Sequence, residues 1–508
     1  MKKLFKLLFS RFNLILIAII LQICLYIILP IILSQSFPAV PINLILSILA
    51  IILVLAIINS DMTQEAQIPL IILCIIAPIL GIAFSLIFLI IKIPRKVKKY
   101  ARKTVTQLKD ALAIDEKDDA NLKEELNESY GQFNYLYNIG MFRSYQNTST
   151  KFFKSGEEFF ESLCSSLKAA EKYIFMEYFI IEDGKMWQAI YKILLEKVKQ
   201  GVEVRFMYDD LGTIYKVPSN FAYKLKKVGI NCVKFNEYSN ATSSIYNNRD
   251  HRKITVIDGK IGFVGGVNLA DEYINEIHPY GVWKDSALMI KGAATKSLVC
   301  MFLQLFDIQS QIEEDFSKYY SDVKEISDGI VCSFGDGPKY AYGDNIAENV
   351  YLNLISHAKD YIYISTPYLI IDSKIKSALC NASMRGVKVV IVTPHIPDKK
   401  IIFKITRSSY KELQEKGVII KEYKEGFIHS KEVVIDDKIG LVGTINLDYR
   451  SFLHHYECGI MMYKSSSVLE IKNDFEEIFK TAINMKDFKQ NIFTKLFCAL
   501  IKLYTPLF

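Results

Sequence analysis

An α/β fold of two tandem lobes, related by a pseudo-twofold axis and preceded by an N-terminal transmembrane helical region, is predicted by three features of the sequence. A 19-residue segment occurs twice, amphipathic helical stretches alternate with short β-branched runs from about residue 150 onward, and three apolar runs lie within the first 91 residues. The 508 residues are enough for two to four domains, and a hydrophobic content of 51% supports large buried cores.

The three apolar runs contain no charged side chain, and each approaches the ~20 residues needed to cross a bilayer. They span residues 14–33, 42–58 and 68–91. A cleaved signal peptide is disfavoured, because the first run is long, lacks a small-residue cleavage site and is followed by two more. We therefore expect residues 1–91 to form a membrane anchor of two to three helices.

Basic residues flank this anchor on both sides, and the larger cluster lies at residues 92–103. Because positive clusters favour the cytoplasmic side, the larger one predicts that the residues after it lie in the cytoplasm, in a multi-pass protein of the cell membrane. The same cluster could attract anionic lipid headgroups or serve as a topology signal alone. Residues 92–140 change from basic to acidic and indicate a charged helical linker.

The same order of strand-like segments occurs twice after the linker. Residues 173–181 correspond to 361–371, residues 201–210 to 386–395, and residues 229–237 to 417–425, and each series ends in the repeated segment. We expect a first lobe at 141–316, a second lobe at 317–485 and an amphipathic C-terminal tail at 486–508. The tail could lie in the lipid interface or pack on the protein.

The repeated segment begins with histidine, and 12 of its 19 aligned positions are identical. Two short β-branched runs joined by a tight turn predict a hairpin, and residues two apart on a strand face the same side. Each copy therefore presents an imidazole, a cation and an amide donor that suit a phosphate: His251, Lys253 and Asn268 in the first copy, and His429, Lys431 and Asn446 in the second.

If the lobes face each other, the two imidazoles bracket one phosphodiester. One would attack phosphorus and form a phosphohistidine, while the other would protonate the leaving alkoxide and later accept a proton from the incoming alcohol. The lysines and asparagines would hold the non-bridging oxygens, so no metal or cofactor is predicted. The nine cysteines lie far apart without ligand spacing, which disfavours both a disulfide framework and a zinc site.

The pattern H-x-K-x4-D-x6-G-[GST]-x-N, present twice, resembles the signature of the phospholipase D superfamily. From about residue 42 to the end the chain resembles bacterial cardiolipin synthases, with agreement in "YDDLG", "WKDSALMIKG", "TPYLI" and "NLDYRSF". The resemblance implies two phospholipase D-like lobes acting on membrane phospholipids. The implied reaction transfers a phosphatidyl group between two phosphatidylglycerol molecules, giving cardiolipin and glycerol.

The resemblance also implies roles for four acids. Asp258 and Asp436 belong to the signature and are counted with the catalytic set. Their position at the hairpin turn, an odd number of residues from each histidine, makes a structural or long-range electrostatic role at least as plausible. Asp285 and Glu457 are implied to bind the histidines, where a carboxylate would fix the tautomer and stabilise the charged ring. A surface or helix-capping role is the alternative for both.

Two local features differ from the expected pattern. Gly266 stands where the second copy has Thr444, so only the second lobe would offer a hydroxyl to the phosphate. His454 and His455 lie close to Glu457 in the sequence. On a strand these neighbours would point opposite ways, so one could reach the site, although two ordinary strand residues are the simpler interpretation.

Three other functions compete with phosphatidyl transfer. A phospholipase D-type phosphodiesterase would use water in place of the alcohol acceptor and hydrolyse phospholipid headgroups. A nuclease is disfavoured by the anchor and by the lack of a broad basic surface, so no nucleic-acid partner is expected. A lipid-binding scaffold is disfavoured because binding alone needs no pair of imidazoles.

Overall fold

The computed structural model describes residues 39–60, 62–90, 95–112, 116–237, 247–323, 325–326, 329–486 and 488–507. The chain divides into two compact units, which are described separately. The smaller unit comprises Met1–Arg95, Ser239–Asn247 and Leu496–Phe508, and the larger one comprises Lys96–Tyr238 and Asn248–Lys495.

Three helices of the smaller unit pack against one another: α4 (Ala39–Ile58), α5 (Gln64–Ile76) and α6 (Pro78–Ile90). The third apolar run, expected as one span, is instead divided between α5 and α6. The break lies at Ala77, because the following proline disfavours a helical conformation there. Within the described residues, no helix combines the length and apolarity that a membrane crossing requires. The first apolar run, 14–33, lies outside these residues.

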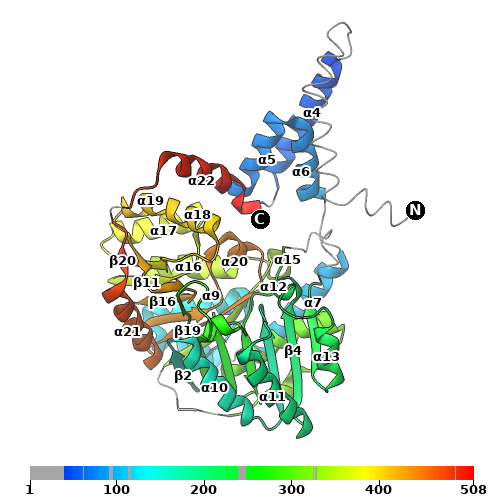
Figure 1. The fold of residues 1–508 in the computed structure, drawn as a ribbon, viewed down its shortest axis with the longest axis vertical. Helices are drawn as coiled ribbons and strands as arrows, with labels where there is room; N and C mark the ends of the chain where they lie inside the picture. Colours follow the sequence, from blue (N-terminus) through cyan, green and yellow to red (C-terminus); the bar gives the residue numbers. More distant parts are fainter. Residues whose placement is uncertain are drawn as a thin grey trace, which may run out of the picture. The chain divides into compact units, whose positions relative to one another are not determined.

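The larger unit contains two mixed sheets whose strands follow the same order (Figure 1). The first sheet runs β2 (Thr148–Phe153), β9 (Ala287–Gly292), β7 (Ile261–Gly265), β6 (Ile254–Ile257), β3 (Tyr173–Tyr178), β4 (Glu203–Asp209) and β5 (Asn231–Phe235). The matching strands of the second are β10 (Ile330–Asp336), β19 (Glu457–Tyr463), β17 (Ile439–Gly443), β16 (Glu432–Ile435), β11 (Tyr361–Ser365), β13 (Lys388–Pro394) and β14 (Ile419–Tyr423).

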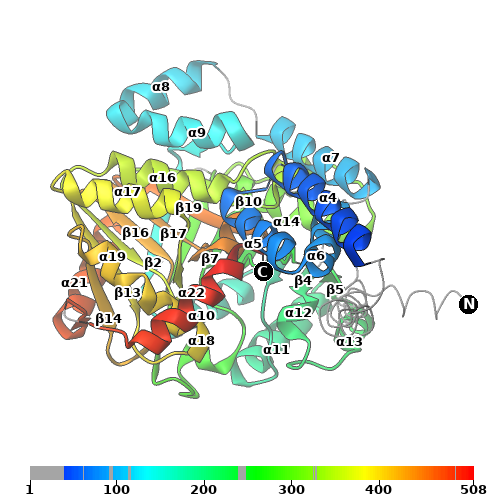
Figure 2. The ribbon, with the colours of Figure 1, turned by 90° about the horizontal axis from the view of Figure 1, so that it is seen from above.

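The second sheet has an extra strand at each edge. β20 (Ile483–Asn484) pairs with β14, and β1 (Ser144–Tyr145) pairs with β10 although it precedes the whole first sheet in the chain. The linker expected at 92–140 is helical where it is described, in α7 (Arg95–Ala111), α8 (Glu116–Leu126) and α9 (Tyr130–Gly140). α9 packs on β10 and on α16 (Ile346–His357), so the end of the linker joins the second lobe (Figure 2).

Helices cover the sheets in matching positions. α11 (Lys185–Lys199) lies on β4 and α13 (Phe221–Lys227) on β5, while α17 (Ser373–Met384) lies on β13 and α19 (Tyr410–Gln414) on β14. α14 (Thr295–Ser310) packs on its own sheet and on β10 of the second lobe; α21 (Ser466–Thr481) packs on its own sheet and on β2 of the first. Such reciprocal contacts are expected of lobes related by a pseudo-twofold axis.

Candidate active site

The repeated segment forms the same hairpin in both lobes, as its sequence predicts. β6 pairs antiparallel with β7, and β16 pairs antiparallel with β17. The strands begin at Ile254 and Glu432, so each histidine and lysine lies in the extended segment just before the strand. Each of these two segments contacts the other lobe through the backbone of its histidine.

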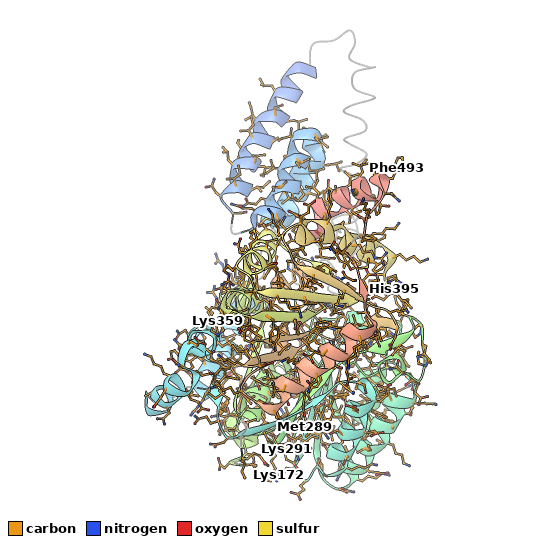
Figure 3. All side chains as sticks on the ribbon, turned by 90° about the vertical axis from the view of Figure 1, so that its left-hand side faces the viewer. Lys172, Met289, Lys291, Lys359, His395 and Phe493 are labelled. Atoms are coloured by element: carbon orange, nitrogen blue, oxygen red, sulfur yellow. The ribbon has the colours of Figure 1, made fainter. Side chains whose placement is uncertain are left out.

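Asp258 and Asp436 occupy the hairpin turns in a left-handed conformation, with φ of 55° and 50°. Asp258 accepts hydrogen bonds from the backbone N–H groups of residues 171–173 at 2.9, 2.7 and 2.8 Å. Asp436 accepts from residues 359–361 at 2.8, 2.9 and 2.8 Å. The donors include the backbone N–H groups of Lys172 and Lys359, two exposed residues that are labelled in Figure 3. Each aspartate thus ties its hairpin to the start of the adjacent strand, which favours the structural interpretation.

His251 is completed by a carboxylate from the second lobe. Its Nδ1 lies 3.0 Å from both carboxylate oxygens of Glu457, which begins β19. The backbone N–H of His251 also donates to the Tyr456 carbonyl at 2.9 Å. The Glu457 side chain is fully buried.

His429 is completed in the reverse sense, by a carboxylate from the first lobe. Its Nδ1 lies 2.6 Å from Asp285 Oδ2, and its backbone N–H donates to the Lys284 carbonyl at 2.7 Å. Parallel pairing of β8 (Val282–Lys284) with β15 (Gly426–Ile428) holds the two segments in register. The lobes therefore exchange carboxylates, and each histidine depends on both of them.

Both lysines of the motif are buried beside their histidines. Lys253 Nζ donates to the His251 carbonyl at 2.6 Å, and Lys431 Nζ donates to the His429 carbonyl and lies 2.9 Å from His429 Nδ1. Burial lowers the pKa of Lys253 to about 8 and that of Lys431 to about 7. These ammonium groups are held close to the imidazoles and are poorly solvated, so an anion between them would be strongly attracted.

Burial also disfavours the charged imidazoles. It lowers the pKa of His251 to about 3 and that of His429 to about 4, although Glu457 and Asp285 act in the opposite direction. Burial alone would raise the pKa values of the two carboxyls, but the adjacent histidines lower them. The resulting state is an ionised carboxylate that accepts Nδ1–H from a neutral imidazole.

The two histidine–lysine sets act on each other electrostatically. The pKa of His429 responds first to burial, Lys431 and Asp285. Lys253 from the other lobe also lowers it. Lys253 likewise lowers the pKa of Lys431, whereas Glu457, the partner of His251, raises it against the effect of burial. The sequence-predicted residues of both motifs thus form one buried site, except for the turn aspartates.

The two asparagines differ in their partners. Asn268 Oδ1 accepts the Ile180 backbone N–H at 3.0 Å, and its Nδ2 donates to the Tyr273 hydroxyl at 2.7 Å. Asn446 Oδ1 is buried without a hydrogen bond to the described residues. Asn268 therefore already has internal partners, whereas Asn446 retains an unused acceptor.

Thr444 and Gly266 each influence the position of a carboxylate in the site. The expectation that Thr444 offers its hydroxyl to the phosphate is corrected, because this hydroxyl donates to Glu457 Oε2. At the matching position in the first lobe, a Cβ on Gly266 would lie 2.0 Å from Asp285 Oδ1. One lobe thus uses a hydroxyl to fix its carboxylate, and the other needs the absence of a side chain.

Several site residues were not found from the sequence. Arg252 donates to the carbonyls of Glu457 and Met301 at 3.2 and 3.1 Å, so it joins the two lobes from the variable position of the motif. The second copy has serine at this position, so a comparison of the two copies does not indicate a role for Arg252. The rings of Tyr273 and Trp283 lie 5.5 and 5.4 Å from that of His429.

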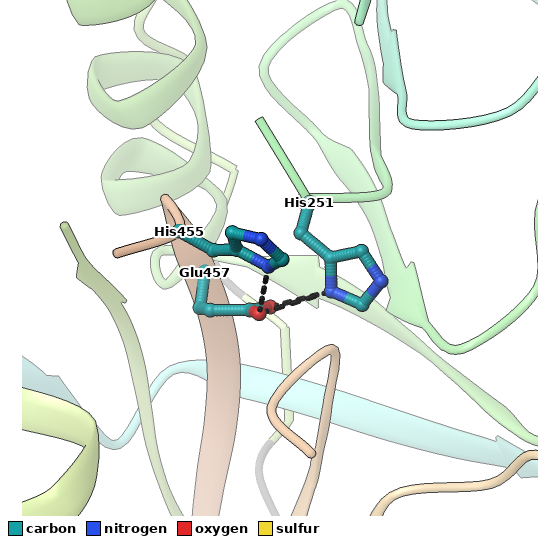
Figure 4. A group of neighbouring side chains, drawn as sticks. All are labelled: His251, His455 and Glu457. Carbon is teal, nitrogen blue, oxygen red and sulfur yellow. Dashed lines mark hydrogen bonds and ion pairs between the residues drawn. The ribbon is translucent and has the colours of Figure 1, made fainter. Parts of the chain in front are cut away.

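The interpretation of His454 and His455 as ordinary strand residues is corrected, because both precede β19 and His455 belongs to the site. Its Nδ1 lies 3.6 Å from Glu457 Oε1, and its ring lies beside that of His251 (Figure 4). These three side chains are the group within the described residues whose donor atoms could hold a metal ion.

Comparisons with known proteins agree with this architecture. The family model described as "Cardiolipin synthase, PLD-like domain" matches residues 163–304 and 351–479. An uncharacterized protein of Streptococcus mutans is 39% identical over 459 residues, covering 89% of this chain and 99% of its own. A cardiolipin synthase of Alkalihalophilus pseudofirmus is 33% identical over 441 residues, covering 85% and 86%. The crystal structure of a phosphatidylserine synthase from Haemophilus influenzae shares the fold, with a TM-score of 0.57 at 15% identity over 75% of this chain and 98% of that chain.

Proposed function

The chain belongs to the cardiolipin synthase family with PLD-like domains, and from this membership we propose that it is a phospholipid phosphotransferase that makes cardiolipin. The proposed reaction moves a phosphatidyl group from one phosphatidylglycerol to a second and releases glycerol. The observation that carries the proposal is the pair of buried imidazoles, each backed by a carboxylate of the opposite lobe.

In the first proposed step, one imidazole attacks phosphorus through Nε2. A P–N bond forms, the P–O bond to glycerol breaks, and the second imidazole gives its proton to the departing oxygen. An anionic phosphodiester between the rings favours the charged form of that second imidazole and so offsets the effect of burial on its pKa. Glu457 and Asp285 would stabilise the rings through Nδ1.

In the second proposed step, the hydroxyl of another phosphatidylglycerol loses its proton to the second imidazole and attacks phosphorus. The P–N bond breaks, and cardiolipin leaves. Lys253 and Lys431, with Asn446 and Asn268, would stabilise the charge on the non-bridging oxygens in both steps. Asp258 and Asp436 would support this geometry from the turns.

We also propose that the protein works at a phospholipid membrane, with the lobes on the cytoplasmic side next to the basic start of α7. Two elements support this. α4 exposes Leu44, Ile51 and Leu55, and α22 (Ile492–Tyr504) exposes Phe493, Leu496 and Leu500, of which Phe493 is labelled in Figure 3. Apolar faces of this kind favour contact with lipid.

The test supplies labelled phosphatidylglycerol alone to the purified full chain in detergent and identifies the products. Cardiolipin with glycerol is the expected result. Phosphatidic acid would instead indicate hydrolysis, with water as the acceptor, and would overturn the transferase assignment. Replacing His251 or His429 with alanine should abolish turnover, and EDTA should not lower it. Substantial turnover in either variant would contradict the two-histidine mechanism.

A further inference from the structure

His455 has no role in the proposed reaction. The residue is nevertheless only 8% exposed and lies within the site. Its ring centroid is 5.4 Å from that of His251, and the ring planes are inclined by 41°. Among the described residues, its Nε2 has no hydrogen-bond partner, and its Nδ1 has only the 3.6 Å contact with Glu457 Oε1. A buried imidazole in this state costs free energy unless a ligand satisfies it.

Three donor groups converge at this point. Figure 4 shows the neighbouring rings of His251 and His455 both facing the Glu457 carboxylate, and one donor atom from each residue lies within 4.8 Å of the other two. Two imidazole nitrogens and one carboxylate oxygen are a donor set that Zn²⁺ binds, with a fourth position left open. Mg²⁺ and Ca²⁺ prefer oxygen donors, so this set favours a transition metal.

We propose that His251, His455 and Glu457 form a binding site for a divalent transition-metal ion, with Zn²⁺ the best match, and that the bound ion inhibits turnover. The binding part stands alone, whereas the inhibitory part rests on the proposed function. The ion takes the lone pair of His251 Nδ1, and the ring proton moves from Nδ1 to Nε2, so the imidazole stays neutral.

Coordination through Nδ1 explains the inhibition. Nε2 then carries the ring proton and has no free lone pair, so it can neither attack phosphorus nor accept a proton. Glu457 is also withdrawn from its hydrogen bond to the ring. The positive charges of Lys253 and Lys431 repel a dication at this site, and the negative charges of Glu457 and Asp285 offset that repulsion.

The binding test uses the metal-free full chain in detergent, titrated with ZnCl₂ against a chromophoric zinc indicator. His455→Asn removes one donor, and His454→Asn is the matched control, because it changes the adjacent histidine, which is outside the group. We expect one tight Zn²⁺ per chain in the wild type and in the control, and at least tenfold weaker binding in His455→Asn. Absence of tight binding in the wild type, or equal affinity in all three proteins, would overturn the site.

His455→Gln provides a second variant, and near-ultraviolet circular dichroism checks that each protein is folded. The turnover test compares each protein with its own metal-free rate. Zn²⁺ should inhibit the wild type at the concentrations that fill the site, EDTA should restore the rate, and His455→Asn should need at least ten times more Zn²⁺. Binding through His455 without any loss of rate would refute the inhibition. A metal-free wild type without turnover would refute the proposed function and leave the binding result standing.

Discussion

Glu457 and Asp285 each determine the state of a catalytic candidate that lies on the other lobe. Both side chains are fully buried, and both contact Nδ1 of their histidine. A carboxylate in this position fixes which ring nitrogen carries the proton and stabilises the charge that develops on the ring. Their negative charge should therefore matter more for the rate than for the fold.

Glu457→Gln and Asp285→Asn keep the shape of the side chain and remove its charge. We expect each to lower the turnover rate by about 10²- to 10⁴-fold, because the tautomer and the charge balance of the imidazole are both disturbed. Initial rates on labelled phosphatidylglycerol measure the effect, with the exposed Glu476→Gln as a control. A rate within threefold of wild type for either variant would argue against the carboxylate–histidine pairs.

The buried imidazoles also make the stability depend on pH. The pKa of His429 is lowered to about 4 in the folded chain, against about 6.5 when unfolded, so the unfolded state binds more protons between these values. Stability is therefore fully present above about pH 6.5 and is lost as the pH falls. We expect His429→Asn to reduce the loss of unfolding free energy between pH 7 and pH 5 by about 2 kcal/mol. Denaturant titrations at the two pH values test this, and an unchanged loss would mean that His429 is charged in the folded protein.

The hairpin turns show a structural role for a position that both copies of the motif share. Asp258 and Asp436 each accept three backbone hydrogen bonds and so fix the hairpin against the neighbouring strand. A side chain with this many internal partners contributes to the position of the whole hairpin, including the histidine at its start.

Replacing these aspartates with asparagine should affect stability first. We expect Asp258→Asn to lower the unfolding free energy by about 2 kcal/mol, because one carboxylate oxygen becomes an amide donor facing other donors. Asp436→Asn should cost less, since its turn is more exposed. Denaturant titration measures both, and the folded variants should keep most of their turnover. A loss of rate as large as that of His251→Ala in a folded variant would restore a catalytic role.

The order of the strands could be predicted from the sequence, because the duplicated segments repeat it. The break between α5 and α6 also had a local signal, in the proline after Ala77. The pairing of carboxylates with histidines had no local signal and was expected only from the family resemblance, because it joins residues 206 and 144 positions apart and depends on how the lobes dock. The placement of β1 in the second sheet escaped prediction for the same reason.

One buried core, which includes Trp187, lies mainly in the first lobe, whereas another runs through both lobes of the larger unit. The core shared by both lobes includes Val256 and Leu298 from the first lobe and Ile364, Leu441 and Ile460 from the second. Because α14 and α21 each pack against strands of both lobes, damage to one core should be transmitted to the other. The lobes should therefore unfold together.

Leu441→Ala tests this cooperation, since it creates a cavity in the second lobe worth about 2–5 kcal/mol. The only two tryptophans of the chain, Trp187 and Trp283, belong to the first lobe. In a Trp283→Phe background, Trp187 fluorescence should report the same shift in denaturation midpoint as far-ultraviolet circular dichroism. The exposed Leu469→Ala is the control and should shift little. An unchanged Trp187 transition would show that the lobes unfold independently.

The exchange of carboxylates has a consequence for ancestry. In a polypeptide with one copy of the repeat, the acid would not reach the histidine of the same chain. Such a polypeptide could assemble this site only by associating with an identical chain. The present protein is thus equivalent to a homodimer whose subunits were fused end to end. Fusion frees the halves to diverge, and the glycine at 266 opposite the threonine at 444 marks a position where they have done so.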